Sequence, residues 1–123
     1  MMIFTLPFDT PSKKNSRVTD TRTGRTFPNR KFVEWHKNAV AYFRSHFSKD
    51  FKPFGCPVFV DIVFTHGTLR RCDSDNKVSS ILDLLVDVGM IPDDNWQIVR
   101  NICVTNRYEK GFSSCTVEVR PYE

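Results

Sequence analysis

One stretch, residues 70–97, constrains the fold of this chain more than any other, because it joins two strand-like runs through one helix. The run 58–65 before it reads VFVDIVFT, which is β-branched and aromatic and predicts a central strand. Within the stretch, apolar residues recur at helical spacing: Val78, Ile81, Leu82, Leu85 and Val88. Gly89 and Pro92 predict the end of this helix, and residues 97–105 predict the next strand. A strand–helix–strand unit is therefore expected at the centre of the fold.

The same stretch holds six of the fourteen carboxylates of the chain: Asp73, Asp75, Asp83, Asp87, Asp93 and Asp94. Asp73 and Asp75 follow the first strand, and residues two apart on an extended chain point to the same side. We expect the second strand to bring Asp93 and Asp94 back beside the end of the first one. Three or four carboxylates would then meet at one edge of a sheet, where a cation is needed to neutralise them.

Each part of this acidic pattern also has an ordinary structural explanation. An acid–x–acid pair is a weak motif, acid pairs are common in turns, and Asp75 and Asn76 are good helix N-caps. The solvent face of the helix would then be polar: Asn76, Ser79, Ser80, Asp83 and Asp87. Spacing alone leaves a metal site and an ordinary capped helix both open.

The rest of the chain supplies further strands and a second helix. Residues 2–6 predict a first strand, 28–47 a helix with an aromatic stripe, and 113–120 a last strand that alternates apolar and polar residues. A turn around 109–111 suggests that the last two strands form a hairpin. We expect an α+β fold with a mixed sheet of about four strands and two helices covering one face.

Length and composition are those of one globular domain, residues 1–123, in which 40% of residues are hydrophobic. We expect no membrane span, since no apolar run approaches the roughly 20 residues needed, and no signal peptide. The four cysteines lack the spacing of a zinc site. Cys56, Cys103 and Cys115 fall in or beside apolar runs, so we expect buried thiols and a reducing cytoplasm, while Cys72 lies beside the acids.

Positive charge is concentrated between residues 13 and 31. Seven basic residues face one acid there, giving +6, whereas the whole chain carries only +4. The basic residues are Lys13, Lys14, Arg17, Arg22, Arg25, Arg30 and Lys31. This segment is a long loop or a hairpin that turns at Thr23-Gly24. It is either a solvated charged loop or a contact surface for a phosphate backbone.

Carboxylates in this arrangement suit Mg²⁺, which takes hard oxygen ligands and keeps several waters. Asp73, Asp75 and Asp94 would meet that need if the two strand ends are neighbours. An ion held there can lower the pKa of a bound water, orient it in line with a phosphodiester and stabilise the departing oxygen. Asp93 would be a ligand, a supporting group or a turn residue. Asp83 lies too far along the helix from Asp75 to share the ion, at about 12 Å.

At this point the sequence resembles a known family. DSDN, a helix containing Asp83, then Gly89 and DDNWQIV are similar to the acidic motif of the RusA family of Holliday-junction resolvases. Leu6-Pro7, Pro11-Ser12 and the basic loop resemble the opening of that family. The resemblance covers most of the chain, and its specific part is the acidic segment.

The resemblance implies a homodimeric, Mg²⁺-dependent endonuclease that cuts symmetrically related strands of four-way DNA junctions. Mn²⁺ is expected to substitute for Mg²⁺, and the source is expected to be bacterial or a phage. The family's metal-binding aspartates correspond to Asp73, Asp75 and Asp94. The family's functional lysine falls on Ser79, so Lys77 would have to replace it if Asn76 and Lys77 are not yet helical. Otherwise Arg70, Arg71 or the Lys13-Lys14 pair would hold the scissile phosphate.

We therefore predict a nuclease in which Asp73, Asp75 and Asp94 bind the metal ion. Lys77 would act beside them, and Asn76, Asp83 and Asp93 would support them. The DNA contacts would come from Lys13, Lys14, Arg17, Arg22, Arg25, Arg30, Arg70 and Arg71. Two rivals stay open: a branched-DNA-binding module without catalysis, and a nuclease for other branched or single-stranded nucleic acid.

Overall fold

A computed structural model describes residues 1–12, 17–19, 21–28, 30–47, 52–71 and 74–122. Its centre is a four-stranded mixed sheet in the order β1-β6-β4-β5. The strands are β1 (Met2–Leu6), β4 (Val58–His66), β5 (Val99–Tyr108) and β6 (Ser114–Pro121). β4 pairs with β5 in parallel and with β6 antiparallel, and β6 pairs antiparallel with β1.

The predicted hairpin of the last two strands is wrong, because β4 lies between β5 and β6. The loop from β5 to β6 instead crosses the end of β4. There the N–H of Glu109 bonds to the carbonyl of His66 at 3.0 Å, and the N–H of Gly111 to that of Gly67 at 2.9 Å. Gly67 permits this crossing, since a Cβ added to it would lie 2.8 Å from Ser113 Oγ and 3.0 Å from the backbone N of Phe112.

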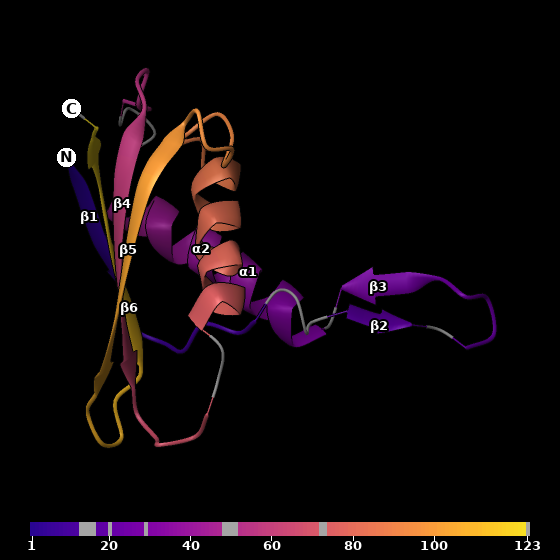
Figure 1. Ribbon diagram of the computed structural model, residues 1–123. Helices are drawn as coiled ribbons and strands as arrows, with labels where there is room; N and C mark the ends of the chain where they lie inside the picture. The colour runs from indigo at the N-terminus through magenta and orange to yellow at the C-terminus, as the bar shows by residue number, and fades with distance from the viewer. Residues whose placement is uncertain (13–16, 20, 29, 48–51, 72–73, 123) are drawn as a thin grey trace.

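Two helices cover one face of the sheet, as predicted: α1 (Arg30–His46) and α2 (Ser74–Asp87) (Figure 1). The aromatic stripe of α1 buries Phe32, Trp35 and Phe43, and alternate residues of β4 and β6 face the helices from the sheet. Gly89, with φ of 81°, ends α2 as expected. The α+β class is therefore confirmed. No helix in the described part of the chain is both long and apolar enough to cross a lipid bilayer.

The basic segment contains a hairpin made of β2 (Arg17–Thr19) and β3 (Thr26–Pro28), which pair antiparallel. Gly24 adopts a φ of 71° in its turn, so the predicted turn at Thr23-Gly24 is confirmed. Figure 1 shows this hairpin standing apart from the sheet and the two helices. The hairpin can therefore reach a partner that the sheet itself does not contact.

The cysteines divide into one buried thiol and two exposed ones. Cys115 on β6 is fully buried, and burial raises the pKa of its thiol to about 12. Cys56 and Cys103 are exposed, so the prediction that they are buried is wrong. Cys103 is exposed because it lies on β5, an edge strand, on the sheet face that the helices leave uncovered. Cys72 lies outside the described residues.

Candidate functional site

The acidic pattern begins at the first turn of α2. The helix begins at Ser74, so Asp75 and Asn76 lie in its first turn, which corrects the prediction that they cap it. Asp73 and the side chains of Asp75 and Asn76 lie outside the described part of the chain. The backbone nevertheless places position 75 at the end of α2 that follows β4.

Asp94 lies at the other end of the same helix. Position 75 precedes Asp87, the last residue of α2, by twelve residues, or about 18 Å along the axis. Beyond Asp87 the chain continues away from the start of the helix. The carbonyl of Met90 accepts a bond from the N–H of Phe54, four residues before β4, and the carbonyl of Ile98 accepts one from Val58, the first residue of β4. The expectation that Asp93 and Asp94 return to the end of β4 is therefore wrong. β4 and β5 are parallel, so the turn before β5 and the start of α2 after β4 lie at opposite ends of the sheet (Figure 1).

Asp93 and Asp94 form an exposed turn before β5. Asp93 accepts bonds from the N–H of Asp94 at 2.8 Å and from the amide of Asn95 at 3.0 Å. These bonds, the backbone one first, lower the pKa of the Asp93 carboxyl from its ordinary value. Asp93 therefore shapes the turn that contains Asp94, and its role at a metal site stays a prediction.

Lys77 points toward the core rather than into solvent. Its side chain is 7% exposed, and its ammonium donates to Asp9 Oδ1 at 3.0 Å. The ammonium also lies 5.8 Å from the centre of the Phe64 ring. Because α2 already includes Asn76 and Lys77, the condition for Lys77 to replace the family lysine is not met. A contact between Lys77 and a phosphate stays a prediction, and it requires the ion pair between Lys77 and Asp9 to break.

A second contact fixes the same N-terminal segment to α2. Ser80, predicted on the solvent face, is fully buried and donates to the carbonyl of Pro11 at 2.7 Å. Together with the pair of Lys77 and Asp9, this bond holds the chain between β1 and the basic hairpin against the helix. Sequence spacing gave no signal for either contact, since the partners are 68 and 69 residues apart.

Among the described residues, one group could hold a metal ion: His36 on α1 with Asp83 and Asp87 on α2. One ligand atom from each lies within 4.8 Å of the others, and His36 Nε2 is 2.6 Å from Asp87 Oδ2. Sequence spacing does not relate His36 to these carboxylates, because they belong to another helix. The contact ties α1 to α2. Asp83 therefore belongs to a different cluster from position 75, as the distance between the two along the helix predicted.

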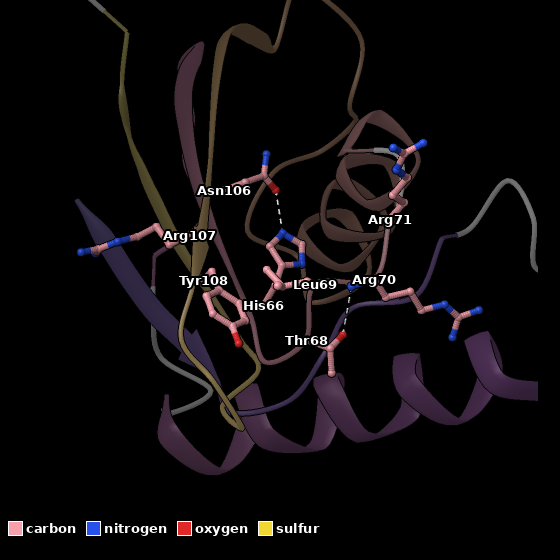
Figure 2. A pocket seen from close by; sticks show the side chains of 8 residues that line it. All are labelled: His66, Thr68, Leu69, Arg70, Arg71, Asn106, Arg107 and Tyr108. Carbon is pink, nitrogen blue, oxygen red and sulfur yellow. Dashed lines mark hydrogen bonds between the residues drawn. The ribbon is translucent and has the colours of Figure 1, made fainter.

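A cavity of about 440 Å³ opens at the shared end of β4 and β5, close to the start of α2. Figure 2 shows its lining, in which His66 Nε2 and Asn106 Oδ1 are joined at 2.8 Å across the two strands. Arg70 and Arg71 extend outward on the helix side, whereas Arg107 points to the opposite side of the sheet. The cavity is also lined by Thr68, Leu69 and Tyr108, and the last two are exposed. Positively charged side chains and exposed apolar side chains thus line the same cavity.

The predicted basic arm is only partly described. Arg22 and Arg25 are exposed in the turn of the hairpin. Arg30, at the start of α1, pairs with Glu34 at 3.0 Å, and both are largely exposed, so this pair contributes little to stability. Lys13, Lys14 and the side chain of Arg17 lie outside the described residues.

Exposed aromatic side chains lie beside an arginine near the start of β5, and sequence spacing does not indicate this contact. Arg100 near the start of β5 lies 5.8 Å from the ring centre of Trp96 and 5.3 Å from that of Tyr122. Trp96 is 71% exposed, and it follows Asp94 by two residues. A stacked cation between two rings can contact phosphates and bases alike.

These features define a class of protein: an α+β domain with arginines at one sheet end and on a separate hairpin, a distribution suited to binding a polyanion. Comparison of the sequence with known families identifies the class of protein more specifically than the geometry does. The family model described as Endodeoxyribonuclease RusA matches residues 7–120. The chain therefore belongs to the RusA endodeoxyribonuclease family. A protein of Aquifex aeolicus (strain VF5), described as "Crossover junction endodeoxyribonuclease RusA", is 25% identical over 113 residues, covering 92% of this chain and 86% of that relative.

Proposed function

We propose that this protein is an Mg²⁺-dependent endodeoxyribonuclease that cuts four-way DNA junctions during recombination and repair. One observation carries the proposal: the family match spans residues 7–120, and with it the whole acidic segment. The name of the Aquifex aeolicus relative supports a crossover junction as the substrate. The chain would act on DNA in the cytoplasm of a bacterial or phage-infected cell, as one domain comprising residues 1–123.

The DNA backbone would be held in two places. Arg70 and Arg71 at the β4–β5 cavity would contact the phosphate that is cut, because they lie next to the first turn of α2. The basic hairpin would hold a more distant part of the junction, with its exposed Arg22 and Arg25 and with its neighbours Lys13, Lys14, Arg17 and Arg30. Contacts of this kind bind without reading sequence and weaken steeply with salt.

Asp73, Asp75 and Asp94 are the proposed metal ligands, for Mg²⁺ or for Mn²⁺ in its place. Carboxylate oxygens bind Mg²⁺ at about 2.0–2.1 Å, so the ligands must lie within a few ångströms of one another. Positions 75 and 94 of one chain are at opposite ends of α2 and do not fit one ion. The residue types suit the ion, but the arrangement within a single chain does not.

The test uses a synthetic four-way junction and a linear duplex of the same sequences, with Mg²⁺ or with EDTA. We expect paired cuts near the branch point only with the junction and Mg²⁺. Asp75→Asn should abolish cleavage and leave junction binding unchanged. The matched control is Asp61→Asn, because Asp61 lies on the face of β4 turned away from both helices.

The outcome separates the proposal from its rivals. A protein that binds the junction tightly but cuts nothing with Mg²⁺ or Mn²⁺ would be a binding module without catalysis. Cutting of flaps or single strands in preference to the junction, at the same salt concentration, would identify another substrate. Full activity in Asp75→Asn would refute the role given to the acidic segment.

A further inference from the structure

Three side chains between α1 and α2 form a cluster that the function proposed above does not use. His36 comes from α1, and Asp83 and Asp87 come from α2, one helical turn apart. One ligand atom from each of the three lies within 4.8 Å of the others. Asp83 is about 12 Å along the helix axis from position 75, and Asp94 does not belong to the cluster. The cluster is therefore separate from the ligands proposed for Mg²⁺.

The charges of this cluster are not balanced within it. Two carboxylates one turn apart on a helix repel each other, and the C-terminal end of a helix carries partial negative charge, so Asp83 and Asp87 are placed unfavourably. α2 has no basic residue in its last turn to offset this. The imidazole of His36 can supply at most one positive charge, which leaves at least one negative charge in excess. A divalent cation would neutralise both carboxylates.

Both helices hold the three side chains in position. The His36 ring lies against two aromatic rings of its own helix, with centres 6.0 Å from Phe32 and 6.3 Å from Trp35. Phe32 and Trp35 are buried in the core, so α1 is anchored on both sides of the histidine. Met90, three residues after Asp87, is fully buried and anchors the end of α2. The cluster therefore exists before any ion binds.

We propose that His36, Asp83 and Asp87 form a Zn²⁺ site that joins α1 to α2. Zn²⁺ binds imidazole nitrogen and carboxylate oxygen at about 2.0–2.2 Å, and in a tetrahedral site such ligands lie about 3.3 Å apart. His36 Nε2 and Asp87 Oδ2, now 2.6 Å apart, have to separate slightly. The other ligand atoms, within 4.8 Å of one another, have to approach by at most about 1.5 Å. Small side-chain rotations supply both changes, and water takes the fourth position.

The ligand types select this ion over the one proposed for the nuclease site. Mg²⁺ takes oxygen ligands and keeps several waters, whereas imidazole suits Zn²⁺. The two proposals are therefore independent of each other. His36 lies in the second turn of α1, and α1 begins two residues after β3 ends, so the ion would also restrain the helix from which the basic hairpin extends.

The test is calorimetric titration of the EDTA-treated chain with Zn²⁺, in an Asp75→Asn background that removes one proposed ligand of the nuclease site. We expect one Zn²⁺ per chain. Loss of a group that only orients a ligand lowers metal affinity roughly 10- to 100-fold, so His36→Ala, which removes a ligand, should lower it by at least about 100-fold. Asp87→Asn keeps the size of the side chain and should also weaken binding, which provides a second variant if His36→Ala does not fold.

His46→Ala is the matched control. His46 is the last residue of α1, and its ring nitrogen lies 2.9 Å from the carbonyl oxygen of Tyr42, so it is a histidine of the same helix outside the cluster. This variant should bind Zn²⁺ as the Asp75→Asn parent does. Co²⁺ in place of Zn²⁺ should show no thiolate charge-transfer band, which distinguishes this site from one at the exposed Cys56 or Cys103.

Four results would overturn the proposal. These are the absence of saturable Zn²⁺ binding, binding that survives His36→Ala unchanged, binding that His46→Ala also abolishes, and a thiolate band with Co²⁺. Displacement of the bound Zn²⁺ by about a hundredfold excess of Mg²⁺ would equally contradict a site with an imidazole ligand. None of these results depends on cleavage of DNA, so they are distinct from failure of the proposed function.

Thermal stability gives a second readout of the same site. Free Zn²⁺ at about 100 times its Kd should raise the Tm of the Asp75→Asn parent by roughly 5–10 °C, because the ion binds the folded chain. His36→Ala starts from a different Tm, since it also lacks the contact with Asp87, so the quantity compared is the shift that Zn²⁺ causes. The shift should vanish in His36→Ala and persist in His46→Ala. An equal shift in all three proteins would refute the assignment.

Discussion

Gly67 provides the sharpest test of the sheet order, because it lies where the β5–β6 loop crosses the end of β4. In Gly67→Ala the new methyl group would lie 2.8 Å from Ser113 Oγ, and 3.0 Å and 3.1 Å from the backbone N and C of Phe112. Ser113 can rotate away, but it would lose the bond that the Gly67 N–H donates to its Oγ at 3.1 Å. Phe112 cannot yield without moving the loop that Gly111 ties to Gly67.

The expected cost combines two effects. Forcing a methyl group against backbone typically costs about 1–3 kcal/mol, and the lost hydrogen bond adds roughly 0.5–1.5 kcal/mol. We therefore expect Gly67→Ala to lower the free energy of unfolding by about 1.5–4.5 kcal/mol, the sum of those two ranges. Urea denaturation followed by circular dichroism measures it. With a slope of about 2 kcal/mol per molar urea, in the middle of the usual range, the midpoint should fall by roughly 1–2 M.

Gly55→Ala is the matched control. Gly55 is exposed, and an added Cβ there meets nothing within 4 Å. Alanine restricts the unfolded chain more than glycine, so this variant should be neutral or more stable by about 0.4–1 kcal/mol. Equal stability of the two variants would show that the loop does not cross β4 as described, and the sheet order would have to be revised.

Three further outcomes follow from individual contacts. Asp9→Asn should destabilise the protein by about 1–3 kcal/mol, because it leaves the buried ammonium of Lys77 with a weaker partner. Lys77→Met removes the ammonium itself and should cost less than about 1.5 kcal/mol. Equal losses of stability in urea denaturation would contradict this account. Burial raises the pKa of the Cys115 thiol from an ordinary 9.0 to about 12, so the stability that the protonated thiol contributes is complete below pH 9 and is lost as the pH rises toward 12. Cys115→Ala should not show this loss. Denaturation measured at a series of pH values tests it. Arg22→Ala with Arg25→Ala should weaken junction binding for all sequences and reduce the slope of log affinity against log salt by roughly two, and an unchanged slope in fluorescence anisotropy would exclude the hairpin from the interface.

The sequence was sufficient for elements whose signal is local. Helical spacing of Val78, Ile81 and Leu85 identified α2, and Gly89 marked its end. Both signals are local, because helical periodicity and a glycine with positive φ involve residues only a few positions apart. The same reasoning found the aromatic stripe of α1. The start of α2 was predicted two or three residues too late, since Asp75 and Asn76 are both suitable N-cap residues but lie within the helix.

What could not be predicted depends on neighbours far along the chain. A short link between β5 and β6 is typical of a hairpin, and only the position of β4 between them decides otherwise. Cys103 has the apolar surroundings of a core residue in sequence but lies on an edge strand. Lys77 resembles a solvated helix residue until Asp9, from the segment after β1, supplies its counter-charge. Pairing of this kind leaves no trace in spacing.

The direction of β5 has the largest consequence for function. Two parallel strands joined by one helix require the helix to return along the whole length of the sheet, so the loop before the helix and the loop after it lie at opposite ends. Aspartates in those two loops therefore cannot bind one ion within a chain, whatever their side-chain rotamers. Spacing along the chain therefore does not decide whether the members of a motif meet. The direction of the second strand decides it, because an antiparallel β5 would have placed both loops at the same end of the sheet.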